Sequence, residues 1–482
     1  MSVTNKVTNG IKWQMLERIL TAVVQFVISV VLARLVLPDE YGIISLVTVF
    51  VTLADLLVTS GFGTALIQKK NIDDSDVNTV FTFSTIVAIG VWLLLFFTSP
   101  FVADFYGIPV ITTVLRVYAL IIWPSAIGGL LRSLYMRELK FKALFLVSAI
   151  PMVVSGVVGV VVALYGGGVY ALVIQNLVNA YGALILVWCI SKRKLRLRYC
   201  KERIAELWKY SWKLLIANIA DVAYKNIYTL CIPKFYNDRV LGFYSYGRQI
   251  PNVIFGTFNS AMVASMFPVF ARKQEDISDL KGCLRKTIRS CNFFYFPIMI
   301  GITALARSII IILLGKEWIE SAWYLQFFCI VYGLHHIQNL NFQAISACGK
   351  SDVFLKYEMM KKIVGIVILA VTLPLGIEWV MWGQVANITI AVLMNIYPNK
   401  KWLQYKLGEQ IRDIVPYVII VMFMFLAVKG CGILLENMNF YLCTVLQVLV
   451  GIMSYMLAAW IFRIEELKET WNIIKSKIKN RD

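Results

Sequence analysis

The chain has 482 residues, of which 59% are hydrophobic and 16% are charged, and its mean hydropathy is +0.72. This balance excludes a soluble globular protein, because too few charged side chains are present to cover the surface of so long a chain. The formal net charge is +19. The lysines and arginines lie in short stretches between apolar segments, a pattern that sets membrane orientation and does not indicate nucleic-acid binding.

About fourteen apolar segments are long enough to cross a bilayer, since a spanning helix needs roughly 20 apolar residues. The sequence therefore predicts an all-α membrane protein. The predicted spans are 11–36, 41–68, 79–99, 112–135, 144–165, 169–190, 211–236, 242–271, 288–314, 321–346, 358–376, 378–398, 413–435 and 439–462. The first apolar stretch is too long for a signal-peptide core, so we expect this helix to stay in the mature protein.

Lysine and arginine are unevenly distributed between alternate turns. They cluster in 137–142, 192–203, 272–286, 350–362, 400–412 and 468–481, whereas 38–41, 99–109, 166–168 and 436–439 contain almost none. Because positive loops stay on the cytoplasmic side, we expect both termini in the cytoplasm. The C-terminal tail has an apolar helical face and is predicted to be an amphipathic helix on anionic lipid.

The sequence contains a faint internal repeat with an offset of about 200 residues. The turn at 37–42 matches 236–242, and the turn at 68–77 matches 271–280. We predict an N-lobe over 1–198 (helices one to six), a C-lobe over 199–402 (helices seven to twelve), two more helices over 403–463, and the cytoplasmic tail over 464–482. Six spans per lobe make the lobes parallel repeats, which would enclose a central cavity.

Polar side chains follow one helical face of spans one, two, seven and eight, and this predicts that the four spans line the cavity. The polar lining residues are Gln14, Thr21, Gln25, Ser29, Thr48, Thr52, Asp55, Asn218, Asp221, Asn252 and Asn259. The cations on these faces, Arg18, Lys225 and Arg248, are the candidate substrate-binding residues, and Arg248 is the deepest one without a local partner. The structural alternative is that these hydroxyls and amides bond neighbouring helices or their own backbone.

The charged residues have structural alternatives as well. Asp221 and Lys225 are four residues apart and would neutralise each other on one helix. Arg18 would reach the membrane surface by extending its side chain. Asp55, Asp221 and His336 are candidates for ion coupling, although a neutral, hydrogen-bonded histidine is the commoner case.

Enzyme motifs are missing from the sequence. It has no Walker loop ending in Gly-Lys-Ser/Thr and no HExxH, so we expect a transporter that needs no cofactor and is driven by an ion or substrate gradient or by the membrane potential. The nine cysteines are scattered, without a CxxC or a Cys/His cluster, so we expect no metal site.

The segment 31–42, Asp55 and the segment 61–68 resemble the Wzx-type polysaccharide transporters, oligosaccharide flippases of the multidrug/oligosaccharidyl-lipid/polysaccharide exporter superfamily. The resemblance implies two parallel six-helix lobes around a cationic cavity, followed by two C-terminal helices, in the bacterial plasma (inner) membrane. It implies that an undecaprenyl-diphosphate-linked oligosaccharide, the repeat unit of an O-antigen, capsule or exopolysaccharide, passes from the cytoplasmic to the outer leaflet by alternating access. Arg18, Lys225 and Arg248 would hold the diphosphate. Membrane lipids, a polysaccharide polymerase and glycosyltransferases are the implied partners.

Three other functions stay open. A lipid II flippase of the MurJ type would share the spans and the cationic cavity. A multidrug or cation antiporter would have an acidic chamber, and the first span offers no carboxylate at mid-depth. A scaffold for a polysaccharide synthase complex would not transport at all.

Overall fold

The computed structural model describes residues 3–59, 66, 72–191 and 195–479, and within these ranges the chain is helical with no strand. The repeat segment 68–71 and most of the segment 61–68 lie outside the described residues. The chain forms two compact units, Met1–Ser245 and Tyr246–Asp482, so the division falls within one helix. The lobe boundaries predicted from the repeat stay a prediction.

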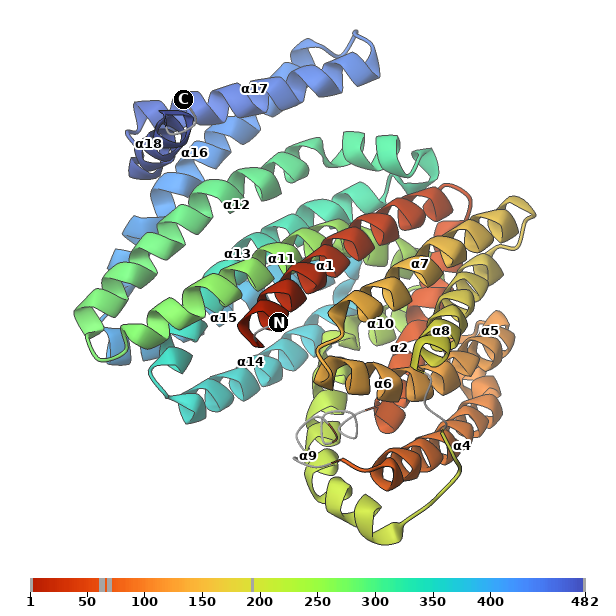
Figure 1. Ribbon diagram of the computed structural model, residues 1–482. Helices are drawn as coiled ribbons and strands as arrows, with labels where there is room; N and C mark the ends of the chain where they lie inside the picture. Colours follow the sequence, from red (N-terminus) through yellow and green to blue (C-terminus); the bar gives the residue numbers. More distant parts are fainter. Residues whose placement is uncertain (1–2, 60–65, 67–71, 192–194, 480–482) are drawn as a thin grey trace. The chain divides into compact units, whose positions relative to one another are not determined.

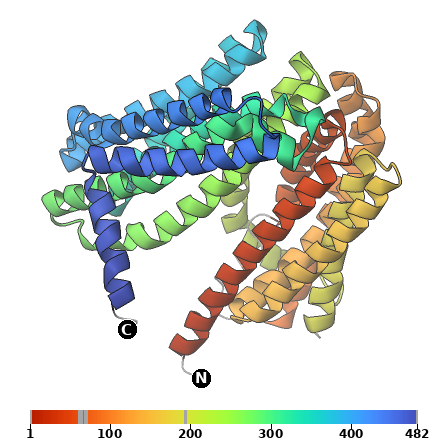
Figure 2. The same ribbon diagram turned by 90° about the horizontal axis from the view of Figure 1, so that it is seen from above.

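The first unit contains nine described α-helices and the start of a tenth (Figure 1). These are α1 (Val3–Ala33), α2 (Pro38–Thr59), α4 (Asp74–Tyr106), α5 (Val110–Tyr118), α6 (Ile122–Arg137), α7 (Phe141–Leu164), α8 (Val169–Ser191), α9 (Lys201–Lys225), α10 (Ile227–Phe235) and the first turns of α11 (Asp238–Arg272). α1 runs beside α7, and α7 is paired with α8 (Figures 1 and 2). Apolar side chains of α4, α6, α7 and α8 form a common core.

The second unit contains the rest of α11 and seven further α-helices. These are α12 (Ile277–Leu313), α13 (Ser321–Ala347), α14 (Ser351–Thr372), α15 (Ile377–Leu403), α16 (Leu407–Leu434), α17 (Phe440–Ile461) and α18 (Glu465–Lys479). α13 packs against α12 and α15, and α16 packs against α12 and α17. Two apolar clusters form the core, one at α12, α16 and α17 and one at α11, α12 and α13.

Within the part of the chain that the structure describes, eleven helices are long and apolar enough to cross a membrane. They are Leu16–Ala33, Pro38–Thr59, Asp74–Tyr106, Val110–Arg137, Phe141–Leu164, Val169–Ser191, Asp238–Arg272, Ile277–Leu313, Ile377–Leu403, Leu407–Leu434 and Phe440–Ile461. The all-α membrane class is therefore confirmed. Among the described helices, α9, α10, α13 and α14 are not in this set although each overlaps a predicted span, so the count of fourteen spans stays a prediction.

The predicted span 211–236 is not a single helix. α9 ends at Lys225, α10 begins at Ile227, and Asn226 between them has a non-helical backbone with φ −108° and ψ 8°. The Asn226 side chain donates from Nδ2 to the carbonyl of Val222 at 2.9 Å. Asparagine side chains compete with the backbone for such hydrogen bonds, which explains why the helix is interrupted here.

Helix caps support the internal repeat. Asp73 caps α4 by accepting from the backbone N–H of Asp76 at 2.8 Å, and the Asp76 side chain accepts from the Asp73 N–H at 3.3 Å. Asp276 caps α12 in the same way, accepting from the N–H of Asp279 at 3.0 Å. α4 ends at Tyr106 and is capped by Gly107, whose φ of +72° suits glycine. Equivalent positions of the repeat therefore begin equivalent helices.

Arg203 of α9 joins α9 to the start of α4. Its guanidinium binds Asp73 at 2.6 Å and also the buried carboxylate of Asp76. The backbone N–H of Asp76 and then Arg203 lower the pKa of Asp73 below its ordinary value. A carboxyl group whose pKa is lowered in the folded protein stabilises the fold at pH values above its unfolded pKa of about 4. This stabilisation is lost as the pH falls through the pKa of the folded protein.

We therefore expect Arg203→Ala to weaken the pH dependence of stability on the acidic side. The measurement is the thermal unfolding midpoint of the purified protein between about pH 6 and pH 3. The midpoint of the wild type should fall more steeply below about pH 4 than that of the variant. Lys201→Ala, which removes an exposed cation from the same helix, is the control. Parallel curves for Arg203→Ala and the wild type would contradict the assignment.

The first turns of α2 and α11 approach each other backbone to backbone within the first unit. A Cβ atom added at Gly42 would lie 1.8 Å from the carbonyl oxygen of Asp238, and one added at Gly242 would lie 1.9 Å from the carbonyl oxygen of Pro38. Pro38 matches Asp238 in the repeat, and Gly42 matches Gly242. The contact is therefore reciprocal, and only glycine fits at either position.

The C-terminal helix α18 docks onto the protein through acidic residues. Glu466 is buried and accepts a hydrogen bond from the Tyr417 hydroxyl, while Glu465 and Glu469 pair with Arg289 and Lys286 of α12 at 3.3 and 2.7 Å. Leu467 packs against the apolar cluster of α12, α16 and α17. The first half of the tail is thus bound to the protein, and Trp471 farther along is exposed.

Candidate functional site

The predicted polar face of α1 is only partly exposed. Arg18 and Gln25 are exposed, whereas Ser29 is buried and donates to a carbonyl of its own helix at 3.1 Å. Thr21 also donates to a carbonyl one turn back, at 2.6 Å. The side chain of Gln14 lies outside the described residues. The structural alternative thus applies to Thr21 and Ser29, and Arg18 and Gln25 stay accessible.

A partly buried ion pair lies beside Arg18 and involves the residue before it. Glu17 accepts from the Ser148 hydroxyl of α7 at 2.6 Å and pairs with Arg132 of α6 at 3.4 Å. Glu17 therefore faces α6 and α7, and Arg18 lies on a different side of α1. Sequence reasoning missed Arg132, because its partner is 115 residues away and no local spacing relates the two.

The polar face of α2 is half-buried against the other helices of the first unit. Thr48 and Thr52 are both half-buried. Asp55 accepts from the Thr59 hydroxyl at 3.4 Å through Oδ2, whereas its Oδ1 is buried and has no hydrogen-bond partner among the described residues. A carboxylate in this position can bind a proton or a cation, which is the chemistry that coupling needs.

On α9 the structural alternative for the charged pair is confirmed. Lys225 and Asp221 form an ion pair of 2.6 Å four residues apart on the same helix. The Lys225 side chain is nevertheless 65% exposed, and Asn218, about two turns earlier, is also exposed. The ammonium group is therefore accessible to a ligand even though it is paired.

The polar face of α11 faces α13 within the second unit. Arg248 was expected to lack a partner, but its Nε donates to the Tyr332 hydroxyl at 3.2 Å. Three turns later, Asn259 accepts from Asn339 of α13 at 2.9 Å. Asn252 between them is exposed. The sequence could not indicate the α13 partners, because the hydrogen bonds join residues 84 and 80 positions apart.

His336 lies in the packed core of the second unit. It is fully buried, and its Nε2 is 2.8 Å from Oδ1 of Asn292. Rings of Phe258, Tyr295 and Phe296 surround it. This is the environment of a structural histidine, which favours that alternative over ion coupling.

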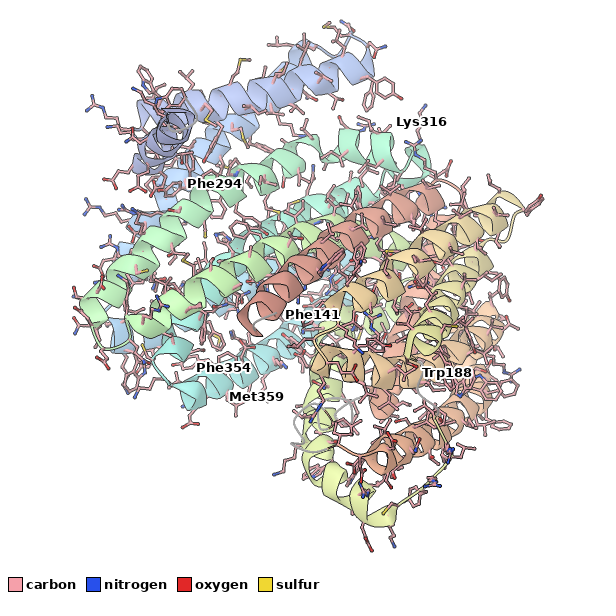
Figure 3. The ribbon with its side chains drawn as sticks, in the orientation of Figure 1. Phe141, Trp188, Phe294, Lys316, Phe354 and Met359 are labelled. Atoms are coloured by element: carbon pink, nitrogen blue, oxygen red, sulfur yellow. The ribbon has the colours of Figure 1, made fainter. Side chains whose placement is uncertain are left out.

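A polar cavity of about 510 Å³ lies between α11, α13 and α14. Its lining combines amide, hydroxyl and carboxylate groups with aromatic rings: Val263, Phe267, Asn339, Phe342, Gln343, Ser346, Phe354 and Glu358. Figure 3 labels Phe354 near the start of α14. Two of these side chains, Asn339 and Gln343, belong to the polar face that the sequence shows on the predicted span 321–346. Glu358 had no sequence signal linking it to them.

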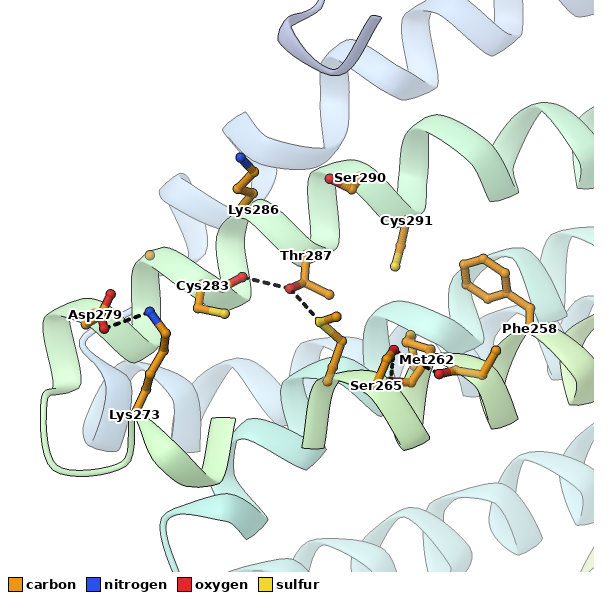
Figure 4. A pocket seen from close by; sticks show the side chains of 13 residues that line it. Phe258, Met262, Ser265, Lys273, Asp279, Cys283, Lys286, Thr287, Ser290 and Cys291 are labelled. Carbon is orange, nitrogen blue, oxygen red and sulfur yellow. Dashed lines mark hydrogen bonds and ion pairs between the residues drawn. The ribbon is translucent and has the colours of Figure 1, made fainter. Parts of the chain in front are cut away.

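A second cavity, of about 670 Å³, lies between α11 and α12 (Figure 4). Its polar groups bond one another: Lys273 pairs with Asp279 at 2.7 Å, and Thr287 donates to the carbonyl of Cys283 at 2.8 Å. The remaining lining is mostly apolar, with Phe258, Met262, Met266 and Cys291 among it.

A family model described as "Polysaccharide biosynthesis protein" matches residues 31–323, which contain α2, α9 and α11 and therefore Asp55, Lys225 and Arg248. The chain belongs to this polysaccharide biosynthesis family. The family match confirms the resemblance seen in the sequence. Arg18 and most of the polar cavity lie outside the matched segment.

Two curated relatives are similar over most of the chain. The succinoglycan biosynthesis transport protein ExoT of Rhizobium meliloti (strain 1021) is 25% identical over 66% of this chain and 64% of its own length. The lipopolysaccharide biosynthesis protein WzxC of Escherichia coli (strain K12) is 22% identical over 75% of this chain and 74% of its own length. The chain thus spans slightly less than two thirds of the succinoglycan transport protein.

A solved structure of the lipid II flippase MurJ, in an inward closed conformation, has the same fold. The TM-score is 0.71 with 14% identity, covering 94% of this chain and 98% of that chain. The chain therefore has the fold of this flippase structure.

Proposed function

We propose that this membrane protein is a flippase, not an enzyme, and that it moves an undecaprenyl-diphosphate-linked oligosaccharide from the cytoplasmic to the outer leaflet by alternating access. The substrate would be the repeat unit of an O-antigen, capsule or exopolysaccharide. The family match over 31–323 carries the proposal. The names of the relatives, which refer to succinoglycan transport and lipopolysaccharide biosynthesis, support it.

The chemistry of the candidate residues fits a diphosphate head group. Arg18 and Lys225 offer exposed cations in the first unit, and Arg248 offers a guanidinium in the second. Arginine binds phosphate oxygens through paired N–H groups, whereas lysine acts as a point charge. The Tyr332 hydroxyl holds Nε of Arg248 and so orients the guanidinium. Among the candidates for ion coupling, Asp55 is supported best, because one oxygen of its carboxylate is buried and has no hydrogen-bond partner among the described residues.

The proposed setting is the bacterial plasma membrane with both termini in the cytoplasm, as the charge distribution of the loops supports. A polysaccharide polymerase and glycosyltransferases would act beside the protein on the same lipid-linked intermediate. The MurJ fold favours lipid II flipping as the second candidate. Depletion of the protein distinguishes the two, because loss of a lipid II flippase stops peptidoglycan synthesis.

We expect Arg248→Ala to reduce polymer export by about tenfold or more, because a charge-assisted hydrogen bond to phosphate is lost. The measurement is surface polysaccharide in a deletion strain that carries the variant, with membrane insertion checked by immunoblot. Arg272→Ala, which removes an exposed arginine at the end of the same helix, is the matched control. Wild-type export by an inserted Arg248→Ala protein would contradict the role of Arg248.

A further inference from the structure

The polar cavity between α11, α13 and α14 has the chemistry of a sugar site. We propose that it binds one sugar residue of the lipid-linked oligosaccharide, with Asn339 and Gln343 as the hydrogen-bonding side chains. The inference rests on the proposed function and names the part of the site that recognises the glycan rather than the diphosphate. The cavity volume of about 510 Å³ lies within the range of small-molecule sites, about 300–1,000 Å³.

Gln343 lines the cavity and has an unused side-chain acceptor. Its Oε1 is buried and has no hydrogen-bond partner among the residues that the structure describes. Buried polar atoms are almost always hydrogen-bonded, because an unpaired one loses its water without compensation. A ligand hydroxyl that donated to this oxygen would restore the missing bond.

Asn339 is held in a fixed orientation beside Gln343. Its Nδ2 donates to Oδ1 of Asn259 at 2.9 Å, and this bond sets which side of each amide faces outward. Asn339, which lines the cavity, then keeps its own carbonyl oxygen as an acceptor. A sugar hydroxyl can donate to this oxygen.

Part of the lining is aromatic. The rings of Phe342 and Phe354 lie with their centroids 3.9 Å apart. Glu358 forms an ion pair with the buried Lys361, whose ammonium lies over the Phe342 ring at 4.6 Å. Flat apolar rings pack against the C–H face of a pyranose. The paired charges of Glu358 and Lys361 leave this end without excess positive charge, which does not favour phosphate.

The mixed lining of the polar cavity suits a sugar better than an alkyl chain. An alkyl chain in the polar cavity would bury the amides of Asn339 and Gln343 without partners. A sugar, with hydroxyls on its rim and C–H groups on its faces, satisfies both kinds of lining.

The test compares two probes on the purified full-length protein in detergent. One is the lipid-linked saccharide extracted from a strain that lacks the protein, and the other is undecaprenyl diphosphate, which has no sugar. Affinity is measured by quenching of tryptophan fluorescence. We expect the wild type to bind the saccharide lipid more tightly than undecaprenyl diphosphate.

The variant Asn339→Leu/Gln343→Leu should lose about tenfold in affinity for the saccharide lipid and keep its affinity for undecaprenyl diphosphate. The second value also shows that the variant is folded. Gln343→Met, which preserves the length of the side chain, should lose about threefold. Asn176→Leu, which removes an amide that donates to its own helix at 2.8 Å, should bind both probes like the wild type.

Each result bears on the assignment. If the double variant and Gln343→Met bound the saccharide lipid as tightly as the wild type, the sugar site would be overturned and the flippase proposal would stand. If the double variant lost both probes while Gln343→Met lost neither, the sugar site would also be overturned. If the wild type bound neither probe, the proposed function would fail and the sugar site with it.

Discussion

Alanine at Gly42 or at Gly242 is expected to stop polymer export. A Cβ atom at Gly42 would lie 1.8 Å from a backbone oxygen of α11, and one at Gly242 would lie 1.9 Å from a backbone oxygen of α2. Neither oxygen can rotate away as a side chain would, so the starts of α2 and α11 must separate. Overpacking of this kind costs about 1–3 kcal/mol or more.

Because the contact is reciprocal, Gly42→Ala and Gly242→Ala should not be additive. Either substitution alone already separates the two helix starts, so the double variant should export no less and melt no lower than the worse single variant. Surface polysaccharide and the thermal unfolding midpoint are the two measurements. Gly90→Ala and Gly128→Ala, placed where an added Cβ meets nothing within 4 Å, are the controls and should leave both values unchanged or higher. Wild-type export by both single variants would contradict the importance of the contact.

Asp413→Ala is expected to lower the free energy of unfolding by about 3–5 kcal/mol, the usual effect of removing one partner of a buried ion pair. The Asp413 carboxylate is fully buried at the start of α16. It accepts from Arg285 at 2.7 and 3.0 Å, from Arg289 at 2.9 Å and from the Tyr405 hydroxyl at 2.8 Å. Alanine would leave these donors without their common acceptor.

The measurement is the denaturant or thermal unfolding of the variant in detergent, with tryptophan fluorescence as the signal. Glu469→Ala is the matched control, because it breaks the exposed 2.7 Å pair with Lys286 on the same end of α12. An exposed pair contributes about 0–1 kcal/mol, so the control should stay close to the wild type. Equal stability of the Asp413→Ala and Glu469→Ala proteins would show that the network at α12 and α16 does not hold the second unit together.

The features of the fold that depend on local sequence could be predicted. Each span predicted from the length of an apolar segment overlaps a helix in the described residues. The repeated turns are followed by helices with matching aspartate caps, Asp73 and Asp276. The interruption at Asn226 was missed. Its cause is one side-chain hydrogen bond within an apolar segment, and hydropathy is insensitive to such a bond.

For the candidate site, the sequence could predict only which residues share a helical face. The spacing of Arg248 and Asn259 correctly put them on one side of their helix, because a periodic pattern needs no knowledge of neighbouring helices. Their partners Tyr332 and Asn339 depend on how α11 packs on α13, which sequence spacing does not contain. The same is true of Glu358, which reaches the polar cavity from a third helix.

The polarity of α13 and α14 has a consequence for biogenesis. These helices are not among those apolar enough to cross a bilayer, and α13 packs between α12 and α15. A translocon that releases segments into lipid one at a time would favour its more apolar neighbours and reject a helix such as α13. Insertion of this region therefore has to be cooperative. The helices α12 to α15 would have to stay together until their polar faces cover one another. A nascent chain that stops within this region would leave α13 without the neighbours that cover its polar face.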